Sequence, residues 1–553
     1  MGQAADEILA AEEIDQQRRQ RADQHGGAHD IVGAYIRAAC RQRDEGGRDR
    51  LLLPGGEDDA EQIFVPDAGE LPDHRDAPGF VHDVMATTFI LFVTGPAYSV
   101  LGADLRRLGV EFCNTDMPHA VVLPDGRHLV IRRDRDVNVQ ALDTLASGDG
   151  ANYRRDMEGI EKDAALLFGL LGGRLWSFAT LKLLLTEAWR RGPLGLKAVL
   201  GNALTPARSW LESSYRSDVA RALWAPWSLH AGLGPEDAFS GQIGKVIGFS
   251  LEAGGSPIVK GGAGKLLAAF SKLIAERGGT IRTQSDAVSV IRTGGRATGV
   301  RVASGAEFSA AKGVICSMTP TQLYERLLGG VQVTNEPNAV ANYRHGKGNF
   351  QMHYALDRMP AWKNAELAQA AVVHLTAGID GVSKACNEAL RGMLPDLPTI
   401  CVQQPHALDP SRCPPGKAIL WLQMPEAPRF VKGDAAGLLG PPEDARWTES
   451  LREAYADRVE AMLAAHIDGF QESVIARRAY SPADIEAMNI NLVGGDPYSG
   501  SSTIDQALLW RPFKHSVNHK TDVEGLYLIG ASTHPGSGLG GGSGFLLAQH
   551  LAG

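Results

Sequence analysis

Residues 526–545, LYLIGASTHPGSGLGGGSGF, lie close to the end of the 553-residue chain and are the best guide to its fold. The segment starts as an apolar strand, continues as a turn with seven glycines among residues 530–544, and runs into an apolar helix. Such glycines let the backbone approach a ligand and expose successive N–H groups, and a helix start adds a positive dipole end. The segment therefore favours an anionic or electron-rich ligand, such as a pyrophosphate or a reduced flavin ring, over a merely flexible loop.

Earlier in the chain, residues 258–317 have the clearest secondary-structure pattern. An amphipathic helix follows Gly261–Gly264 and ends at Gly278-Gly279. A strand at 280–283, a hairpin over 287–303 with Gly294-Gly295 at its turn, and strands near 307–309 and 313–317 complete the unit. This alternation of helix, strand and meander predicts an α/β domain.

The rest of the chain predicts a second, α+β domain. Residues 151–250 have helical patterns rich in Leu, Ala and Trp, and residues 330–480 mix strands, helices and Pro-rich loops. Further predicted elements are a hairpin over 121–131, strands at 350–355, 418–424 and 525–529, and helices at 449–465 and 544–551. We expect a discontinuous ligand-binding domain over 77–135, 255–330 and 485–553, and a substrate-binding domain over 136–254 and 331–484.

Charge and cysteine content exclude several classes of protein. The net charge is −9, which gives no support to a nucleic-acid partner. Residues 1–76 hold nine Arg, no Lys and 18 acidic residues, so they carry the whole excess. Six cysteines without C-x-x-C spacing indicate free thiols in a reducing compartment rather than a disulfide scaffold. We expect a cytoplasmic protein of undetermined oligomeric state.

The most apolar stretch, Leu166–Leu185, contains Arg174 and Lys182 and is a poor membrane span. It predicts either a buried helix or an interfacial helix in peripheral contact with a membrane. No signal peptide is visible in the first 25 residues.

Other chemical motifs fail on inspection. Gly264-Lys265 is followed by Leu266 where a P-loop needs Ser or Thr, and Ser543 lacks the last glycine of a hydrolase elbow. The sequence has no H-E-x-x-H, and the close set His515, His519 and His534 lies in a loop-rich region, so no metal site is predicted.

Three matched segments make residues 77–553 resemble the phytoene-desaturase-like FAD-dependent oxidoreductases, closest to the pyridine nucleotide-disulfide oxidoreductase domain-containing protein 2 group. The first is Gly530-Ala-Ser-Thr-His-Pro-Gly536. The second comprises Gly494-Gly495-Asp496, Asp505-Gln506 and Arg511-Pro512. The third is Gly278–Thr283 with Asp286-Ala-Val288 and Gly295–Val300.

The resemblance implies an α/β fold with a Rossmann-like FAD-binding domain and a mixed substrate domain. It implies that the backbone at Val288 meets the adenine, that the Gly530–Ser532 turn lies beside the pyrophosphate and ribityl chain, and that the helix start at Gly540–Ser543 faces the flavin. The implied cofactor-binding residues are Val288, Gly530, Ala531, Ser532, His534, Pro535, Gly536, Gly540, Gly541, Gly542 and Ser543. A helix start at this place would stabilise an anionic reduced flavin.

The N-terminal segment departs from this pattern. A Rossmann domain of this kind opens with a strand, G-x-G-x-x-G and a helix, yet residues 1–76 contain no G-x-G. Three explanations stay open: a divergent Rossmann unit, an unrelated leader that leaves the flavin fold incomplete, or a segment read in the wrong frame.

We therefore expect an FAD-dependent oxidoreductase of desaturase or dehydrogenase type, acting on an apolar or carbonyl-bearing small molecule. The alternatives are a flavin-deficient relative that acts as a binding or scaffold protein, and a flavin amine oxidase. Two interpretations stay open for the tryptophans: an apolar tunnel or a packed core would contain Trp224, Trp227 and Trp421. For His534 they are a role in proton transfer and a role in loop architecture. No catalytic base is identified.

Overall fold

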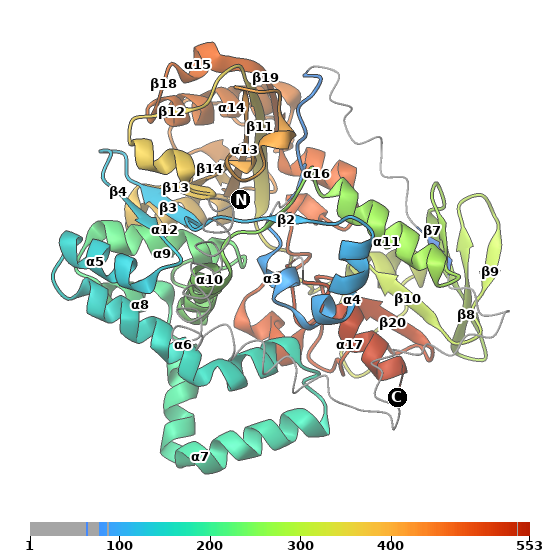
Figure 1. Ribbon diagram of the computed structural model, residues 1–553. Coiled ribbons are helices and arrows are strands. Elements are labelled where there is room, and N and C mark those ends of the chain that lie inside the picture. The colour runs from blue at the N-terminus through green and yellow to red at the C-terminus, as the bar shows by residue number, and fades with distance from the viewer. Residues whose placement is uncertain (1–61, 65–76, 86–87, 539, 553) are drawn as a thin grey trace, which may run out of the picture.

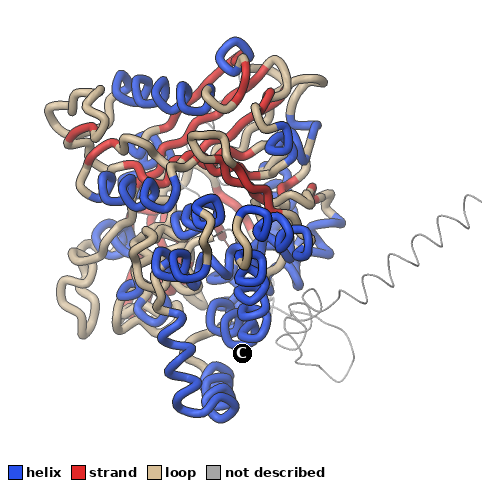
Figure 2. The backbone as a smooth tube through the Cα atoms, turned by 90° about the vertical axis from the view of Figure 1, so that its left-hand side faces the viewer, coloured by secondary structure: helices blue, strands red, loops and turns tan. Residues whose placement is uncertain are grey.

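Two sheet regions of different construction make up the protein (Figure 1). The computed structural model describes residues 62–64, 77–85, 88–538 and 540–552. One region is a seven-stranded sheet that fills the upper half of the molecule in Figure 2. The other consists of short parallel strand pairs beside a three-stranded meander.

The large sheet has the order β19-β11-β16-β15-β13-β3-β4 and is antiparallel except where β13 meets β3. Its strands are β3 (His119–Val122), β4 (His128–Ile131), β11 (Gly348–Leu356), β13 (Val372–Leu375), β15 (Ile400–Gln403), β16 (Ala418–Ala427) and β19 (Val474–Tyr480). Every residue of β11 and β16 is buried. A sheet buried on both faces needs cover on both, and the helices provide it.

Because successive side chains along a strand point to opposite faces, the large sheet contributes side chains to two hydrophobic cores. Phe350, Met352 and Tyr354 pack against α14, whose first turn is capped by the Thr448 hydroxyl. On the opposite face Val121 and Trp421 pack against α9 and α10. The helices around this sheet are α5 (Arg135–Leu145), α6 (Asp149–Gly172), α7 (Phe178–Ala203), α8 (Ala207–Ser214), α9 (Asp218–Leu229), α10 (Ser240–Gly254), α12 (Gly378–Leu390), α13 (Pro405–Leu408), α14 (Glu449–Ala464), α15 (Phe470–Ser473) and α16 (Pro482–Met488).

Minor elements fill the connections. The two-stranded ladders pair β2 (Phe112–Cys113) with β5 (Ile258–Val259), β12 (Ala361–Trp362) with β18 (Ile467–Asp468), and β14 (Met393–Leu394) with β17 (Gly433–Asp434). The short 3₁₀ and π segments are η1 (Gln322–Leu327), η2 (Ala365–Gln369), η3 (Pro410–Arg412), η4 (Val493–Gly495), η5 (Ile504–Gln506) and η6 (Leu508–Trp510).

The second region carries the glycine-rich stretch. Its strands are β1 (Gln62–Phe64), β6 (Thr280–Arg282), β7 (Ala287–Thr293), β8 (Arg296–Val302), β9 (Glu307–Ser309), β10 (Val314–Ser317) and β20 (Leu526–Ile529). β1 pairs with β6 and β10 pairs with β20, both in parallel, while β7, β8 and β9 form the meander. Its helices are α3 (Ile90–Val93), α4 (Pro96–Arg107), α11 (Gly264–Glu276) and α17 (Gly542–Leu551).

A buried ion cluster joins the two regions. The Arg412 guanidinium is fully buried, with Nη1 2.9 Å from Asp83 Oδ2 and Nε 3.3 Å from Asp409 Oδ2. The same carboxylates accept the Ala263 N–H at 2.8 Å and the Gly261 N–H at 2.6 Å, just before α11. The loop that contains Asp409 and Arg412 is thereby tied to a helix start of the second region.

Most predicted elements are confirmed. The 121–131 and 287–303 hairpins, the helix before Gly278 and the elements at both ends of the glycine-rich turn are present. The domain bounds stay a prediction, and the structure adds that β3 and β4, within the predicted 77–135 segment of the ligand-binding domain, pair into the seven-stranded sheet. Pairing of β3 with the distant β13 puts them in the large sheet, and local pattern does not encode that contact. A polar helix considered for residues 4–22 lies outside the described residues.

Candidate flavin site

The glycine-rich turn leads from β20 into α17. Gly530, Gly536 and Gly541 have φ values of 100°, 107° and 64°, a region that side chains other than glycine rarely adopt. Gly541 is the N-cap of α17, and no side chain caps the first turn of that helix. The first N–H groups of α17 therefore have no side-chain cap, which is the condition under which a helix start can bind an anionic ligand.

Packing within the chain accounts for other glycines of the turn. A Cβ on Gly538 would lie 2.7 Å from Leu91 Cδ1 of α3, and one on Gly542 would lie 2.8 Å from Pro535 Cγ. Gly540 approaches the Leu91 carbonyl oxygen, at 3.5 Å from its would-be Cβ. These glycines let α3 pack against the residues just before α17, so packing within the chain accounts for part of the glycine pattern.

The hydroxyl groups of the stretch face the protein rather than open space. Ser543 Oγ accepts the Gly530 N–H at 2.9 Å and ties the end of β20 to the start of α17. Ser532 is 1% exposed, and its Oγ donates to the Ser499 carbonyl at 3.1 Å. The predicted contributions of residues 530–543 are therefore mainly those of backbone groups.

Arg511 supports this turn, a role that the sequence does not reveal. The side chain is buried, and its guanidinium donates to four carbonyl oxygens: Ala531 at 2.8 Å, Tyr498 at 2.8 Å, Ser501 at 3.0 Å and Gln506 at 3.4 Å. Burial lowers the pKa of this guanidinium. The Arg511-Pro512 pair is visible in the sequence as part of a motif, but the identity of its acceptors requires the fold.

Asp496 organises the loop that supplies two of those carbonyls. It is fully buried and accepts backbone N–H groups from Gly346 at 2.6 Å, Tyr498 at 2.8 Å and Gly500 at 2.8 Å. Residues 494–512 thus support the glycine-rich turn through hydrogen bonds to backbone groups.

His534 is buried in the structure. Its Nε2 lies 2.9 Å from the Gly173 carbonyl oxygen, and its own carbonyl oxygen lies 3.0 Å from His519 Nε2. Burial lowers the pKa of His534 to about 4, so the ring is neutral at pH 7 and Nε2 donates. These contacts give His534 an architectural role; a role in proton transfer stays a prediction. His515 is exposed and takes no part in this network.

Val288 occupies an irregular position in β7. The pairing of β7 with β8 shifts register between Ala287 and Ser289, so Val288 lies at a β-bulge. A bulged residue leaves the ladder and has backbone groups to offer elsewhere. This geometry suits the implied contact of the Val288 backbone with an adenine ring.

The described residues provide only part of a flavin site. They supply the bulge at Val288, the left-handed glycines and the uncapped start of α17, which fit the adenine edge and the flavin end of FAD. Among the described residues the β1–β6 and β10–β20 pairs are separate, whereas a Rossmann sheet is continuous.

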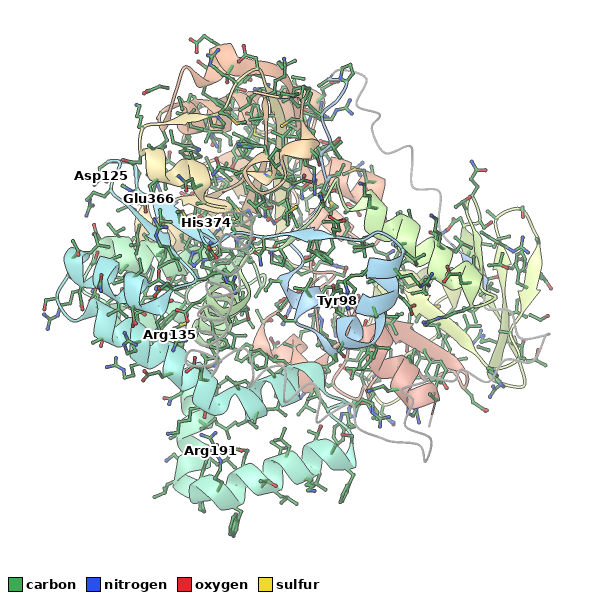
Figure 3. All side chains as sticks on the ribbon, in the orientation of Figure 1. Tyr98, Asp125, Arg135, Arg191, Glu366 and His374 are labelled. Carbon is green, nitrogen blue, oxygen red and sulfur yellow. The ribbon has the colours of Figure 1, made fainter. Side chains whose placement is uncertain are left out.

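A second cluster lies between the large sheet and its helices, where Figure 3 shows His374. His230 Nε2 and His374 Nε2 are 2.9 Å apart, and His119 Nδ1 accepts from Trp227 Nε1 at 3.2 Å. Burial lowers the pKa of His119 to about 3 and of His230 to about 4, so both are neutral. Trp224, Trp227 and Trp421 are buried in the adjoining core, which agrees with the core interpretation.

These histidines do not form a preorganised metal centre. The donor atoms of His230, His374 and Cys401 spread over 4.8 Å. Donors around a tetrahedral zinc ion are closer, because metal–ligand bonds are about 2.0–2.3 Å long. Nδ1 of His374 also lacks the hydrogen-bond partner that usually orients a metal-bound histidine. A hydrogen-bonded histidine pair accounts for the geometry.

The known proteins to which the chain is similar include oxidoreductases. It is 28% identical over 399 residues to pyridine nucleotide-disulfide oxidoreductase domain-containing protein 2 of Mus musculus, over 69% of this chain and 66% of that protein. It is 25% identical to one chain of the limonene dehydrogenase of Castellaniella defragrans, over 86% of each sequence. It is 24% identical to a 4,4'-diapophytoene desaturase of Methylomonas sp., over 81% of this chain and 83% of that one. No family profile matches the chain.

Solved structures agree at the level of fold. An oxidoreductase from Methanosarcina mazei superimposes with a TM-score of 0.52 at 13% identity, over 89% of this chain and 94% of that one. A putrescine oxidase gives a TM-score of 0.52 at 11% identity, over 89% of this chain and 98% of that one. The relatives and the fold confirm the resemblance to phytoene-desaturase-like FAD-dependent oxidoreductases. They also confirm an α/β fold with an α+β second domain.

Proposed function

We propose that this chain, a relative of the phytoene-desaturase-like FAD-dependent oxidoreductases, is itself a desaturase- or dehydrogenase-type enzyme that uses FAD. The observation that carries the proposal is the uncapped start of α17, which follows the left-handed glycines and rests on the buried Arg511. A helix start aimed at a ligand stabilises negative charge that develops there.

Each part of the turn has a defined task in this proposal. FAD, when bound, supplies the acceptor for a hydride or its equivalent. Gly530 and Ala531 would lie along the chain of the cofactor, and Gly541, Gly542 and Ser543 would present their backbone to the flavin end. His534, Pro535 and Gly536 would hold the turn in shape, and Val288 would meet the adenine.

The substrate we propose is an apolar or carbonyl-bearing small molecule. Two relatives are named for limonene and for diapophytoene, which are hydrocarbons. The large sheet presents Trp421 and the histidine cluster on the face covered by α9 and α10. The same sheet holds the fully buried Glu426, and burial raises the pKa of its carboxyl to about 7. Trp421, His374 and Glu426 are buried in the packed core, so they do not decide between a hydrocarbon and a carbonyl-bearing substrate.

The compartment we propose is the cytoplasm. All five described cysteines are free thiols, as expected in a reducing environment. No helix in the described residues is long and apolar enough to cross a bilayer.

The decisive test is the visible absorption spectrum of the purified chain before and after addition of FAD and desalting. Retained bands near ~370 and ~450 nm, the signature of oxidised flavin, would support the proposal. A protein that is colourless after FAD addition and desalting would contradict the proposal. It would favour the second candidate, a flavin-deficient binding or scaffold protein. The separation of the two parallel strand pairs is the observation in favour of that candidate.

A pair of variants tests the role of the helix start. Gly544 lies in the first turn of α17, and a Cβ there would have space, with Ile529 Cδ1 at 4.0 Å as its nearest neighbour. We expect Gly544→Asp to weaken FAD binding about 10-fold, because a carboxylate would compete for the positive helix end. Gly544→Asn has the same shape without the charge and should bind nearly as the parent does. Equal binding by both variants would argue against the site.

An amine oxidase is the third candidate, because putrescine oxidase shares the fold. Identity of 11% shows the fold alone. Peroxide production on addition of amines would favour this alternative over a desaturase or dehydrogenase.

A further inference from the structure

The α6–α7 arm, residues 166–204, projects from the body of the protein, at the bottom of Figure 1. Large apolar side chains along it are exposed to solvent, with Trp189 89%, Phe178 81% and Leu194 81% exposed. The full set is Trp176, Phe178, Leu181, Leu184, Leu185, Trp189, Leu194, Leu200 and Leu204. So many large apolar side chains exposed on one arm indicate an interaction site.

Helix α7 has its apolar and polar faces reversed relative to an ordinary surface helix. Phe178, Leu181, Leu185 and Trp189 follow one another at spacings of three and four residues, so they form one outward stripe. The inner face carries buried Glu187, which bonds Arg191 at 2.6 Å, and Arg191 in turn bonds Asp163 of α6 at 2.6 Å. Figure 3 shows Arg191 at this position. Ion pairs therefore hold α7 against α6, and the apolar stripe on the opposite face is free to bind a partner.

Charge identifies the kind of partner. Residues 166–204 contain five Lys and Arg and one Glu, although the whole chain has a net charge of −9. Lys182 is exposed beside the stripe, and Lys197 is exposed in the part of α7 that follows the break at Gly192. Trp176 and Trp189 have the amphipathic rings that suit a membrane interface. An apolar stripe with basic flanks matches the surface of an anionic bilayer.

The root of the arm is fastened to the glycine-rich turn. The Gly173 carbonyl oxygen bonds His534 Nε2 at 2.9 Å, and the backbone of Trp176 exchanges two hydrogen bonds with Asn518, at 3.1 and 3.2 Å. We propose that the α6–α7 arm docks on an anionic lipid bilayer and holds the glycine-rich turn at a fixed position next to the membrane surface. This docking does not depend on FAD binding.

Flotation of the full chain with vesicles tests this assignment. We expect the chain to float with vesicles of phosphatidylcholine and phosphatidylglycerol. The triple variant Phe178→Ser, Trp189→Ser and Leu194→Ser should lose this binding by about 10-fold or more. The matched control replaces Leu267, Leu390 and Leu438 with Ser, which are 67–73% exposed outside the arm, and should float like the parent. All six positions are exposed, so neither variant should unfold the chain.

A charge variant separates the two parts of the interaction. Lys182→Gln with Lys197→Gln should lower binding to the anionic vesicles several-fold and leave binding to pure phosphatidylcholine unchanged. Absence of flotation, or flotation that the Phe178, Trp189 and Leu194 changes do not affect, would overturn the proposal. So would a chain that self-associates without lipid and becomes monomeric in the triple variant, because a second copy would then cover the stripe.

Discussion

The seven-stranded sheet and the pairs around β20 show two opposite ways of placing strands in one chain. β11 and β16 are buried along their whole length, between the core packed on α14 and the core packed on α9 and α10. In contrast, β10 pairs within the described residues with β20 alone, and Ile315 of β10 is 50% exposed. Parallel strands are ordinarily buried on both faces, so this pair is the unusual one.

The difference shows where the stability of each region originates. The large sheet rests on apolar burial, which is distributed over many side chains. The β20 region depends on a few polar contacts, above all those of Arg511, Asp496 and Ser543, which hold the loops around β20 in place. Single polar substitutions should therefore have large, local effects in the second region.

Arg511→Met should have the strongest effect on the β20 region. It would leave four carbonyl oxygens of the turn and its supporting loop without their donor, at a cost of about 4 kcal/mol in the free energy of unfolding. Hydrogen exchange measured by mass spectrometry should show faster exchange in 526–529 and 494–506, with β11 unchanged. Arg391→Met, at an exposed arginine, is the control and should leave both regions as they are. Equal acceleration in β11 would mean that the two regions unfold as one unit.

Acid should destabilise the large sheet through its buried histidines, as it should the β20 region through His534. Burial lowers the pKa of His119 to about 3, whereas an unfolded histidine titrates near 6.5. Between these values the unfolded chain binds a proton that the folded chain does not, so stability falls as the pH falls from about 6.5 toward 3. Each such histidine should cost about 2 kcal/mol between pH 7 and pH 5.

His119→Gln isolates the contribution of one histidine to this acid response. Glutamine keeps an acceptor for Trp227 Nε1 and has no titration in this range. The variant should lose about 2 kcal/mol less than the parent between pH 7 and pH 5, as urea unfolding at both pH values would measure. The exposed His515→Gln should behave as the parent does. An unchanged pH dependence in His119→Gln would show that this histidine does not carry the acid response.

The sequence is most informative where short-range patterns decide the structure. The hairpin through Gly294-Gly295, the helix that ends before Gly278 and the strand–turn–helix at 526–551 follow from spacing and turn residues. The role of β3 in the large sheet cannot be obtained in this way, because it depends on pairing with residues some 250 positions later. Hydrophobic alternation is the same for either partner.

In the candidate site, too, local features can be predicted from the sequence and contacts between distant segments cannot. The positive φ values at Gly530, Gly536 and Gly541 agree with the predicted turn. No local pattern indicates that Ser532 faces the protein, that Leu91 requires the glycine at 538, or that Arg511 collects four carbonyls. Each of these contacts joins segments that are distant in the sequence, so no short sequence pattern predicts it.

A smaller effect is expected inside the turn. Ser543→Ala removes the acceptor of the Gly530 N–H, worth about 1 kcal/mol. The exchange rate of the Gly530 amide, followed by NMR, should therefore rise about 5-fold. Ser537→Ala changes a half-buried serine of the same turn that does not contact Gly530 in the described structure, and it serves as the control. Unchanged protection of Gly530 in Ser543→Ala would show that the helix start and the strand end are held by other contacts.

The weakest effect of the series decides whether the β20 region is complete. Ile315 is 50% exposed, whereas its neighbour Val314 is 8% exposed. With β10 in a two-stranded pair, Ile315→Asp should change the free energy of unfolding by less than about 0.5 kcal/mol, and Val314→Asp should cost several times more. If residues 1–76 instead contribute a divergent Rossmann unit that covers β10, Ile315 would be buried and Ile315→Asp would cost about 3 kcal/mol. Urea unfolding of both variants, with and without FAD, distinguishes these outcomes. If Ile315→Asp lowers the free energy of unfolding only slightly, and FAD does not increase this loss, the flavin fold is incomplete, because no strand covers Ile315 even when the cofactor is present.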